Sequence, residues 1–390
     1  MLSLSQPGAP RRPAWVEIDM AQLRRNLEHI RADLPPGLRW CSVVKDQAYG
    51  HGAVEIAQAT VAAGAACLAV ATLDEALELQ HARLPAPILI FGERPAAELE
   101  ICVRHGFQIF VNDTQQAAQL DRLCRKHNCS AAVQVEVDTG LNRYGVRWTE
   151  ALPVVNAIRQ HPTLRLAGLM THFAMSDELD KTFAFEQLRR FDEAVQQIRR
   201  AGLLWDASRA EAPLLHACNS GGYLDLPRAH FDLVRMGILP LGVYPSQVCR
   251  RVPGLAPVMS VKTQVAAIKA IAAGDTVGYG MRYRAETPRT IAVLPLGYGD
   301  GFPRVRNLGQ VLLHGCRAPI IGGNAMDAMM IDITDIPQAR PWDEVVILGR
   351  QGTQEISVHE LAAWGATVSY DIMTRWSVRL PRVYPGQTQS

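Results

Sequence analysis

The sequence predicts an α/β fold, with an N-terminal (β/α)8 TIM barrel followed by a C-terminal, mainly β domain. About eight short apolar runs alternate with longer amphipathic segments over roughly 200 residues, a pattern typical of a parallel sheet. The glycine-rich turn GxGxxG, which an open doubly wound sheet carries after its first strand, is missing. Beyond about Pro253 the rhythm changes to strands separated by Gly, Pro and Asp turns. Eight units therefore favour a closed barrel over an open sheet.

The barrel strands are expected at apolar runs rich in β-branched residues. Amphipathic segments such as LDEALELQHA and FEQLRRFDEAVQQIRRAG separate most of them. In chain order, the expected strands are residues 39–44, 67–72, 87–92, 107–112, 131–137, 164–173, 213–220 and 231–237.

The second domain is expected to be mostly β, with strands at 258–271, 289–297, 309–315, 329–334 and 343–349. One helix interrupts them, where Ser357 and Glu360 fit a capping box and Gly365 fits a C-cap. We expect the barrel to span residues 14–250 and the β domain to span 251–390.

Composition and charge argue against several classes of protein. The 390 residues include 40 basic and 38 acidic side chains, a net charge of +2, which offers no broad electrostatic surface for nucleic acid. No apolar run approaches the ~20 residues that span a bilayer, and the N-terminus lacks the apolar core of a signal peptide. The eight cysteines are scattered singly, without CxxC or zinc-site spacing. We expect a cytoplasmic protein with no metal, nucleic-acid or membrane partner.

The carboxyl ends of barrel strands are where catalytic residues lie. The first strand ends at Lys45, and burial at a barrel mouth lowers the pKa of a lysine and frees its amine to form a Schiff base. A lysine at a strand end can equally extend into solvent. The fifth strand ends near Glu136, Asp138 and Arg143, and the sixth ends at His172.

The loops after strands seven and eight are the usual phosphate site of this fold. The seventh strand ends at Asn219 and Ser220, and the eighth contains Arg235, followed by Gly237 and Ile238. The Ser220 hydroxyl and the amides near Gly237 are suitable donors to a phosphate. Each residue alone often belongs only to a structural hydrogen-bond network, but together on one rim they favour a functional site.

From about Ala14 to Tyr384 the sequence resembles the bacterial alanine racemase family. The matching stretches are AWVEIDMAQLRRN, VVKDQAYGHG, DTGLNRYG, THFAMSD, the pair Asn219–Ser220, VRMGI, VGYGMRYRA, LPLGYGDGFPR, AMDAMMIDIT and SYDIMTRWSVRLPRVY. Of these, VVKDQAYGHG resembles the family's long and specific cofactor-lysine motif. The resemblance implies a pyridoxal-phosphate-dependent isomerase that interconverts L- and D-alanine, a cell-wall precursor.

The resemblance also implies two bases. Lys45 would hold the cofactor and act on one face of the substrate α-carbon, while Tyr279, from the partner subunit of a homodimer, would act on the other. Two bases on opposite faces allow racemisation without rotating the substrate. His172 would hydrogen-bond Tyr279, and Arg235 would face the pyridine nitrogen and leave it largely unprotonated.

The remaining implied contacts surround the cofactor and the substrate. Tyr49, Asn219, Ser220, Gly237, Ile238 and Tyr370 would contact the cofactor, mostly at its phosphate. Arg143 and the backbone of Met326 would hold the substrate carboxylate, and Tyr283 and Tyr298 would lie at the entrance. Asp327 would be a supporting or turn residue rather than a catalyst.

Three positions depart from the family pattern. Glu136 stands where many members have a lysine that becomes carbamylated and positions the neighbouring arginine, and a glutamate could orient Arg143 without carbon dioxide or simply be tolerated. Gly323, followed by Asn324, stands where an entrance arginine is common, and Ala328 replaces a common glutamine. Asp177, the expected acidic partner on the other wall, remains. These losses predict a wider entrance that admits substrates larger than alanine.

Three alternatives to alanine racemisation follow. The same chemistry could act on other or several amino acids, such as serine, lysine or arginine, and the entrance departures support this. A decarboxylase on the same plan generally carries a GGG-type phosphate loop, which this chain lacks. A non-catalytic pyridoxal-phosphate carrier of the single-domain type would have no counterpart of Tyr279 or Met326.

Overall fold

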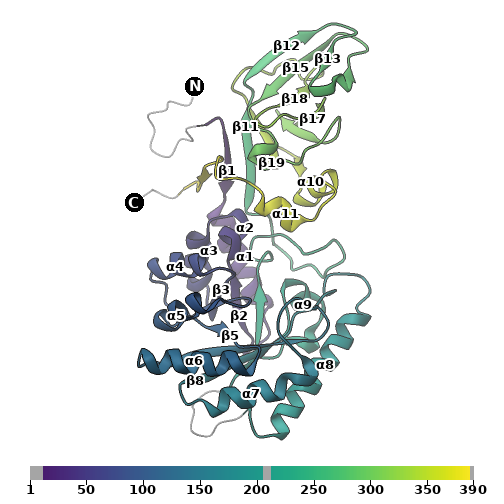
Figure 1. Cartoon of the computed structure of the whole chain (residues 1–390). Coiled ribbons are helices and arrows are strands. Elements are labelled where there is room, and N and C mark those ends of the chain that lie inside the picture. Colours follow the sequence, from purple (N-terminus) through teal and green to yellow (C-terminus); the bar gives the residue numbers. More distant parts are fainter. Residues whose placement is uncertain (1–11, 205–211, 387–390) are drawn as a thin grey trace.

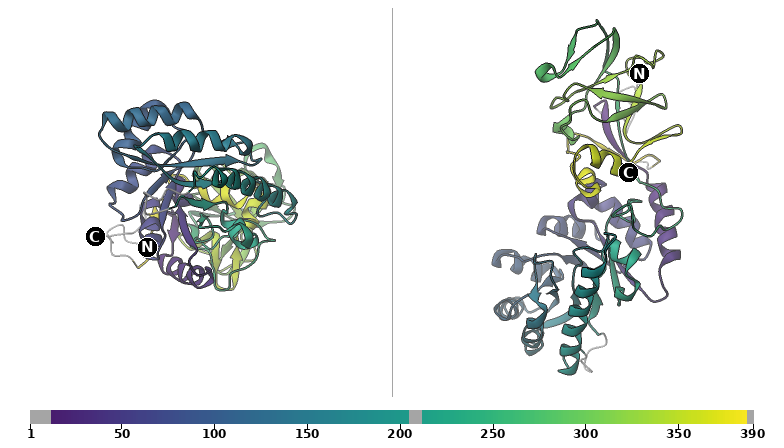
Figure 2. Two further views of the ribbon diagram at one scale, coloured as in Figure 1. Left: turned by 90° about the horizontal axis from the view of Figure 1, so that it is seen from below. Right: turned by 90° about the vertical axis from the view of Figure 1, so that its right-hand side faces the viewer.

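The computed structural model describes residues 12–204 and 212–386, and these form two domains stacked end to end (Figure 1). A barrel of parallel strands with helices around it makes one end of the molecule, and a mainly antiparallel sheet makes the other. The right-hand view of Figure 2 shows the same elongated arrangement from the side, with the C-terminal helices, in yellow, between the two parts. The expected barrel followed by a β domain is confirmed.

Two parallel sheets make the barrel, in the strand orders β10-β2-β3-β4 and β5-β6-β8-β9, with β7 (Val146–Arg147) beside β6. Two backbone hydrogen bonds join the sheets. The amide of Ile90 donates to the carbonyl of Gln108 over 2.9 Å, and the amide of Asp232 donates to the carbonyl of Leu215 over 3.0 Å. The barrel strands are β2 (Arg39–Val43), β3 (Cys67–Val70), β4 (Ile88–Ile90), β5 (Ile109–Phe110), β6 (Ala131–Asp138), β8 (Leu164–Met170), β9 (Leu214–His216) and β10 (Leu233–Met236). Each lies at a run that the sequence predicts as a strand.

Helices cover the outside of the barrel, and their apolar faces pack on the strands. The side chain of Asp19 caps α1 by accepting from the Gln22 amide, and Thr72 and Glu75 form a capping box on α4. Within the described ranges, no helix is both long and apolar enough to cross a bilayer. The helices of this part are α1 (Met20–Asp33), α3 (Ala53–Ala62), α4 (Leu73–His81), α5 (Ala96–His105), α6 (Thr114–Lys126), α7 (Ala151–Gln160), α8 (Thr182–Arg200) and α9 (Ser220–Asp225). The segment α2 (Lys45–Gly50) lies at the mouth of the barrel and has left-handed backbone angles at residues 46–49.

The second domain is built on a sheet of order β12-β15-β18-β17-β16-β19-β11-β1-β21, with β20 beside β19. The hairpin β13–β14 carries the VGYG motif on its turn. The strands are β1 (Ala14–Ile18), β11 (Met259–Gln264), β12 (Ala267–Ile271), β13 (Thr276–Val277), β14 (Tyr283–Arg284), β15 (Arg289–Leu294), β16 (Gln310–Leu313), β17 (Cys316–Ile321), β18 (Met329–Asp332), β19 (Glu344–Gln351), β20 (Gln354–Ile356) and β21 (Arg382–Val383). The helices α10 (Val358–Trp364) and α11 (Ser369–Thr374) follow β20.

Two local expectations need correction. The sequence places residues 14–18 with the barrel, but this strand pairs antiparallel with β11 along its whole length, because alternation in a short strand does not specify its partner. Ser357 caps α10 as expected, by accepting from the Glu360 amide. The Glu360 carboxylate, however, pairs with Arg317 at 2.6 Å instead of completing the capping box.

The carboxyl end of the barrel faces the second domain, and α11 closes one side of it. The ring of Tyr370, on α11, lies 6.2 Å from the ring of Tyr49. A Cβ on Gly50 would fall 2.4 Å from the carbonyl oxygen of Met373, so only glycine permits this approach. The backbone just after Lys45 is thus packed directly against the C-terminal part of the chain.

Candidate active site

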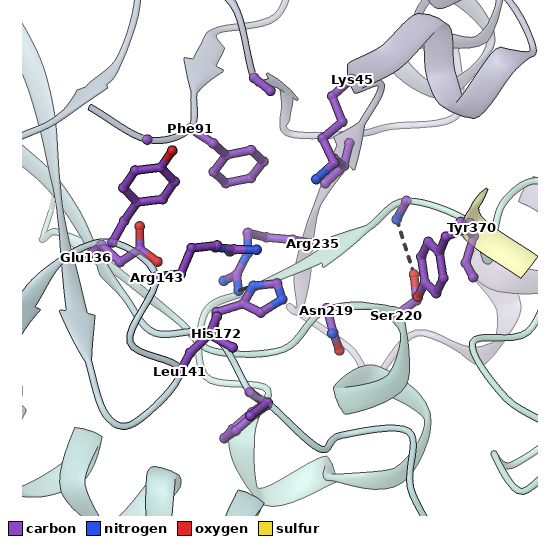
Figure 3. A pocket seen from close by; sticks show the side chains of 18 of the residues that line it. Lys45, Phe91, Glu136, Leu141, Arg143, His172, Asn219, Ser220, Arg235 and Tyr370 are labelled. Atoms are coloured by element: carbon purple, nitrogen blue, oxygen red, sulfur yellow. Dashed lines mark hydrogen bonds between the residues drawn. The ribbon is translucent and has the colours of Figure 1, made fainter. Parts of the chain in front are cut away.

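A cavity of 450 Å³ opens at the carboxyl ends of the barrel strands. Except for Asp138, all the site residues that the sequence predicts on the barrel, together with Tyr370, line it: Lys45, Tyr49, Glu136, Arg143, His172, Asp177, Asn219, Ser220, Arg235, Gly237, Ile238 and Tyr370. Figure 3 shows Ser220 and Tyr370 at one end of the cavity and Glu136 and Arg143 at the other, with Lys45 reaching in between.

Apart from Tyr370, the predicted site residues of the second domain lie elsewhere. Tyr279, Tyr283, Tyr298, Gly323, Met326 and Asp327 do not line this cavity. The side chain of Tyr279 is 73% exposed and that of Met326 is 56% exposed. One chain therefore brings together only part of the predicted set.

Lys45 directly follows β2, so the strand delivers its amine into the cavity. Burial lowers its pKa, and the positive charge of Arg143 lowers it further. Within the described residues, Lys45 has no hydrogen bond or ion pair. A lysine with a lowered pKa and no partner is suited to bind a carbonyl carbon covalently.

The segment after Lys45 is a left-handed turn. Asp46, Gln47, Ala48 and Tyr49 all have φ between 50° and 56°. This conformation costs an L-residue about 1–2 kcal/mol relative to the right-handed one, so the surroundings must hold it. The turn brings Tyr49 to the same cavity that receives Lys45.

Arg235 is the central cation of the cavity floor, 2% exposed. Its Nη atoms donate to the carbonyls of Thr171 (2.8 Å), Ala217 (3.0 Å) and His216 (3.2 Å). They also contact Nδ1 of His216 at 2.9 Å and Nδ1 of His172 at 3.3 Å. No described residue accepts from its Nε. This network fixes the guanidinium and leaves one donor for a bound molecule.

The phosphate end is formed by close packing. The Gly237 amide donates to Oγ of Ser220 over 3.2 Å (Figure 3), and Oδ1 of Asn219 accepts from the Gly222 amide over 2.9 Å. A Cβ on Gly237 would lie 2.2 Å from the hydroxyl oxygen of Tyr49, so glycine is required there. Burial raises the pKa of Tyr49, whose phenol stays neutral and can donate.

These residues fit pyridoxal phosphate in three respects. The amine of Lys45 suits its aldehyde, the hydroxyls of Ser220 and Tyr49 suit its phosphate, and the remaining Nε–H of Arg235 suits its ring nitrogen, an acceptor. The cavity joins all three.

Glu136 does not pair with Arg143: within the described residues, no ion pair or hydrogen bond joins the two side chains. Glu136 is 4% exposed, and burial raises the pKa of its carboxyl while the charge of Arg143 opposes that rise. Any influence on Arg143 is therefore exerted through space, without contact.

Sequence reasoning missed several lining residues: Phe91, Gly92, Arg94, Leu141, Tyr144, Phe173 and Ala174. Phe91 and Gly92 end the third predicted strand, residues 87–92, so the strand-end rule already contained a signal for them. It also missed His216, buried on β9 beneath Arg235, for which one sequence carries no signal.

The barrel, the β domain and this cavity define a class: enzymes that hold pyridoxal phosphate on a barrel lysine. Family models agree with this assignment. Residues 18–245 match the model described as alanine racemase, N-terminal domain, and residues 258–384 match alanine racemase, C-terminal domain.

Known proteins agree over nearly the full length. An alanine racemase of Halothermothrix orenii is 38% identical over 96% of this chain and 98% of its own, and one of Syntrophobacter fumaroxidans is 40% identical over 92% and 94%. The structure of alanine racemase from Bacillus anthracis with bound L-Ala-P is 32% identical, with a TM-score of 0.88 over 99% of this chain and 98% of that one. The chain belongs to the alanine racemase family, whose members are amino-acid racemases that use pyridoxal phosphate.

Proposed function

We propose that this enzyme interconverts L- and D-alanine by moving a proton between Lys45 on one face of the α-carbon and Tyr279 of the partner subunit on the other. Relatives named alanine racemase along the whole chain support alanine as the substrate. Pyridoxal phosphate, when bound, supplies an electron sink for the pair left behind when the α-proton leaves.

The observation that carries the two-base proposal is the division of the predicted site. The barrel residues gather in one cavity, whereas Tyr279 and Met326 stand exposed on the β domain. In a twofold dimer the same exposed surface of each chain meets its partner. We propose that the domain from about residue 251 onward contributes these residues to the cavity of the partner subunit.

The cations of the cavity fit the proton transfers. The lowered pKa of Lys45 favours the neutral amine, which is the form that accepts a proton. Arg143 supplies a positive charge at the end away from Ser220, where it would hold the substrate carboxylate. A tyrosine acts as a base only where positive charge or hydrogen bonds stabilise its phenolate, and Arg143 and His172 would provide these to Tyr279 of the partner subunit.

The geometry beside Gly323 favours alanine over larger substrates. A Cβ at position 323 would lie 3.4 Å from Cγ and 3.7 Å from Nε of Arg306. The space that an arginine at 323 would use therefore already has a guanidinium next to it, which removes the main argument for a wider entrance.

We also propose that the enzyme is cytoplasmic, since the eight cysteines in the sequence show no disulfide pattern.

Borohydride reduction tests the assignment of Lys45. The enzyme purified with pyridoxal phosphate should carry a reduced pyridoxyl group on the peptide that contains Lys45, and Lys45→Ala should carry none. A label on another lysine, or equal labelling of the variant, would contradict the proposal.

A further inference from the structure

His51 lies beneath the left-handed turn and touches two of its carbonyls. Its side chain is fully buried, with Nδ1 3.0 Å from the carbonyl oxygen of Ala48 and 2.9 Å from that of Tyr49. A carbonyl oxygen only accepts, so Nδ1 must carry the proton and donate to both. No other donor in the described part of the chain reaches the Tyr49 carbonyl.

The other ring nitrogen of His51 has no partner within the described ranges, which indicates that the Nδ1–H donor is the reason for a histidine at this position. Nε2 of His51 is buried and has no hydrogen-bond partner among the described residues. Leaving a buried acceptor unsatisfied destabilises the fold, and an apolar side chain would avoid that cost. Burial lowers the pKa of His51 to about 4, so the ring stays neutral and keeps this tautomer near neutral pH.

Other contacts hold the two ends of the turn. At its start, the Asp46 amide donates to Oε1 of Glu75 over 2.6 Å. Beyond its end, Nε of Arg382 donates to the carbonyl of Gly50 over 3.2 Å, and the hydroxyl of Tyr384 donates to the carbonyl of His51 over 3.1 Å. Between these anchors, the side chain of His51 hydrogen-bonds the backbone carbonyls of the strained residues Ala48 and Tyr49.

We propose that His51 is a positioning residue, whose Nδ1–H holds the left-handed turn so that Lys45 and Tyr49 face the same cofactor. The inference rests on the proposed function, in which Lys45 binds the aldehyde and Tyr49 lies at the phosphate. Without the donor, the carbonyls of Ala48 and Tyr49 lose their hydrogen bonds to Nδ1, the strained backbone shifts, and the hydroxyl of Tyr49 leaves its place beside Gly237. His51 itself does not line the cavity.

Two substitutions distinguish the effect of losing the hydrogen-bond donor from the effect of losing the imidazole ring. The amide nitrogen of His51→Asn falls near the place of Nδ1 and keeps the donor, whereas His51→Leu keeps the bulk and loses it. We expect pyridoxal phosphate, titrated into the resolved enzyme and followed by fluorescence, to bind His51→Leu at least about tenfold more weakly than wild type. His51→Asn should stay within about threefold.

A merely structural histidine gives a different result: both variants melt at lower temperature while their dissociation constants for pyridoxal phosphate stay equal to that of wild type. That outcome overturns the inference. If His51→Leu does not fold, His51→Gln replaces it, since its amide nitrogen falls near Nε2 and cannot reach both carbonyls. Failure of the proposed function looks different again, because wild type itself would then take no borohydride label on Lys45.

Discussion

Nη2 of Arg235 lies 3.3 Å from Nδ1 of His172. An arginine only donates, so Nδ1 of His172 accepts and the neutral ring carries its proton on Nε2. Burial and the neighbouring charges of Arg235, Arg143 and Lys45 hold the pKa of His172 well below its ordinary value. His172 therefore presents a donor to whatever lies on its other side, as a partner to Tyr279 of the neighbouring subunit requires.

Acid should destabilise this fold through its neutral histidines. The pKa values of His51, His172 and His216 are all lowered by burial. As the pH falls, these histidines therefore bind protons in the unfolded chain before they do so in the native chain. The free energy of unfolding should fall as the pH drops below about 6.5, by up to about 1.4 kcal/mol per pH unit for each histidine. Urea unfolding at pH 7.0, 6.0 and 5.0 measures this dependence. In His51→Asn, the free energy of unfolding should fall less steeply with decreasing pH, by the contribution of one histidine. A stability independent of pH in this range would contradict it.

Glu136→Gln tests whether the carboxylate acts on Arg143 through space. The change keeps the shape and removes the charge, so KM for alanine should rise severalfold. Because burial raises the pKa of Glu136, its ionised form is disfavoured in the fold, and the Tm of the variant should stay equal or rise. An unchanged KM would mean that the glutamate is only tolerated at this position.

Arg306→Ala tests whether the guanidinium of Arg306 takes the place of the entrance arginine that is missing at position 323. Wild type should prefer alanine to serine, lysine and arginine by about a thousandfold in kcat/KM, which corresponds to a difference of ~4 kcal/mol in activation free energy. Removal of the Arg306 side chain should narrow that preference for the larger substrates. Arg350→Ala is the control, because Arg350 pairs with Glu355 on β20 and neither residue belongs to the predicted entrance. Equal preferences in wild type and Arg306→Ala would contradict a role for Arg306.

Tyr279→Phe should affect the two directions unequally. The variant keeps the ring and loses the hydroxyl that exchanges the proton, so solvent deuterium should enter one enantiomer about 10²–10⁴-fold more slowly, while exchange on the Lys45 face is largely kept. Tyr283→Phe, on the same hairpin, serves as the control. Symmetrical retention of both exchanges would argue against two separate bases.

The barrel side of the site could be predicted because its signal is local. Lys45, His172 and Ser220 each end an apolar run, and the end of a barrel strand is sufficient to place a side chain in the mouth. Tyr279 has no such local signal: it is named from the resemblance of its VGYG motif, which assigns it to the cavity of the partner subunit.

Features that depend on distant parts of the chain could not be predicted. The residues DQAY do not indicate a left-handed turn, and two of the residues that anchor it, Arg382 and Tyr384, come more than 300 residues later. The partner of strand 14–18 lies about 240 residues away, and five or six alternating residues fit many edges equally well.

The shared site is tested most directly by mixing two inactive variants, Lys45→Ala and Tyr279→Phe. A mixed dimer has one cavity with both defects and one with neither, so random exchange of equal amounts should restore about a quarter of the wild-type activity. Activity no higher than the sum of the two parents, in a sample shown to contain mixed dimers, would contradict a site built from Lys45 and Tyr279 of the partner subunit.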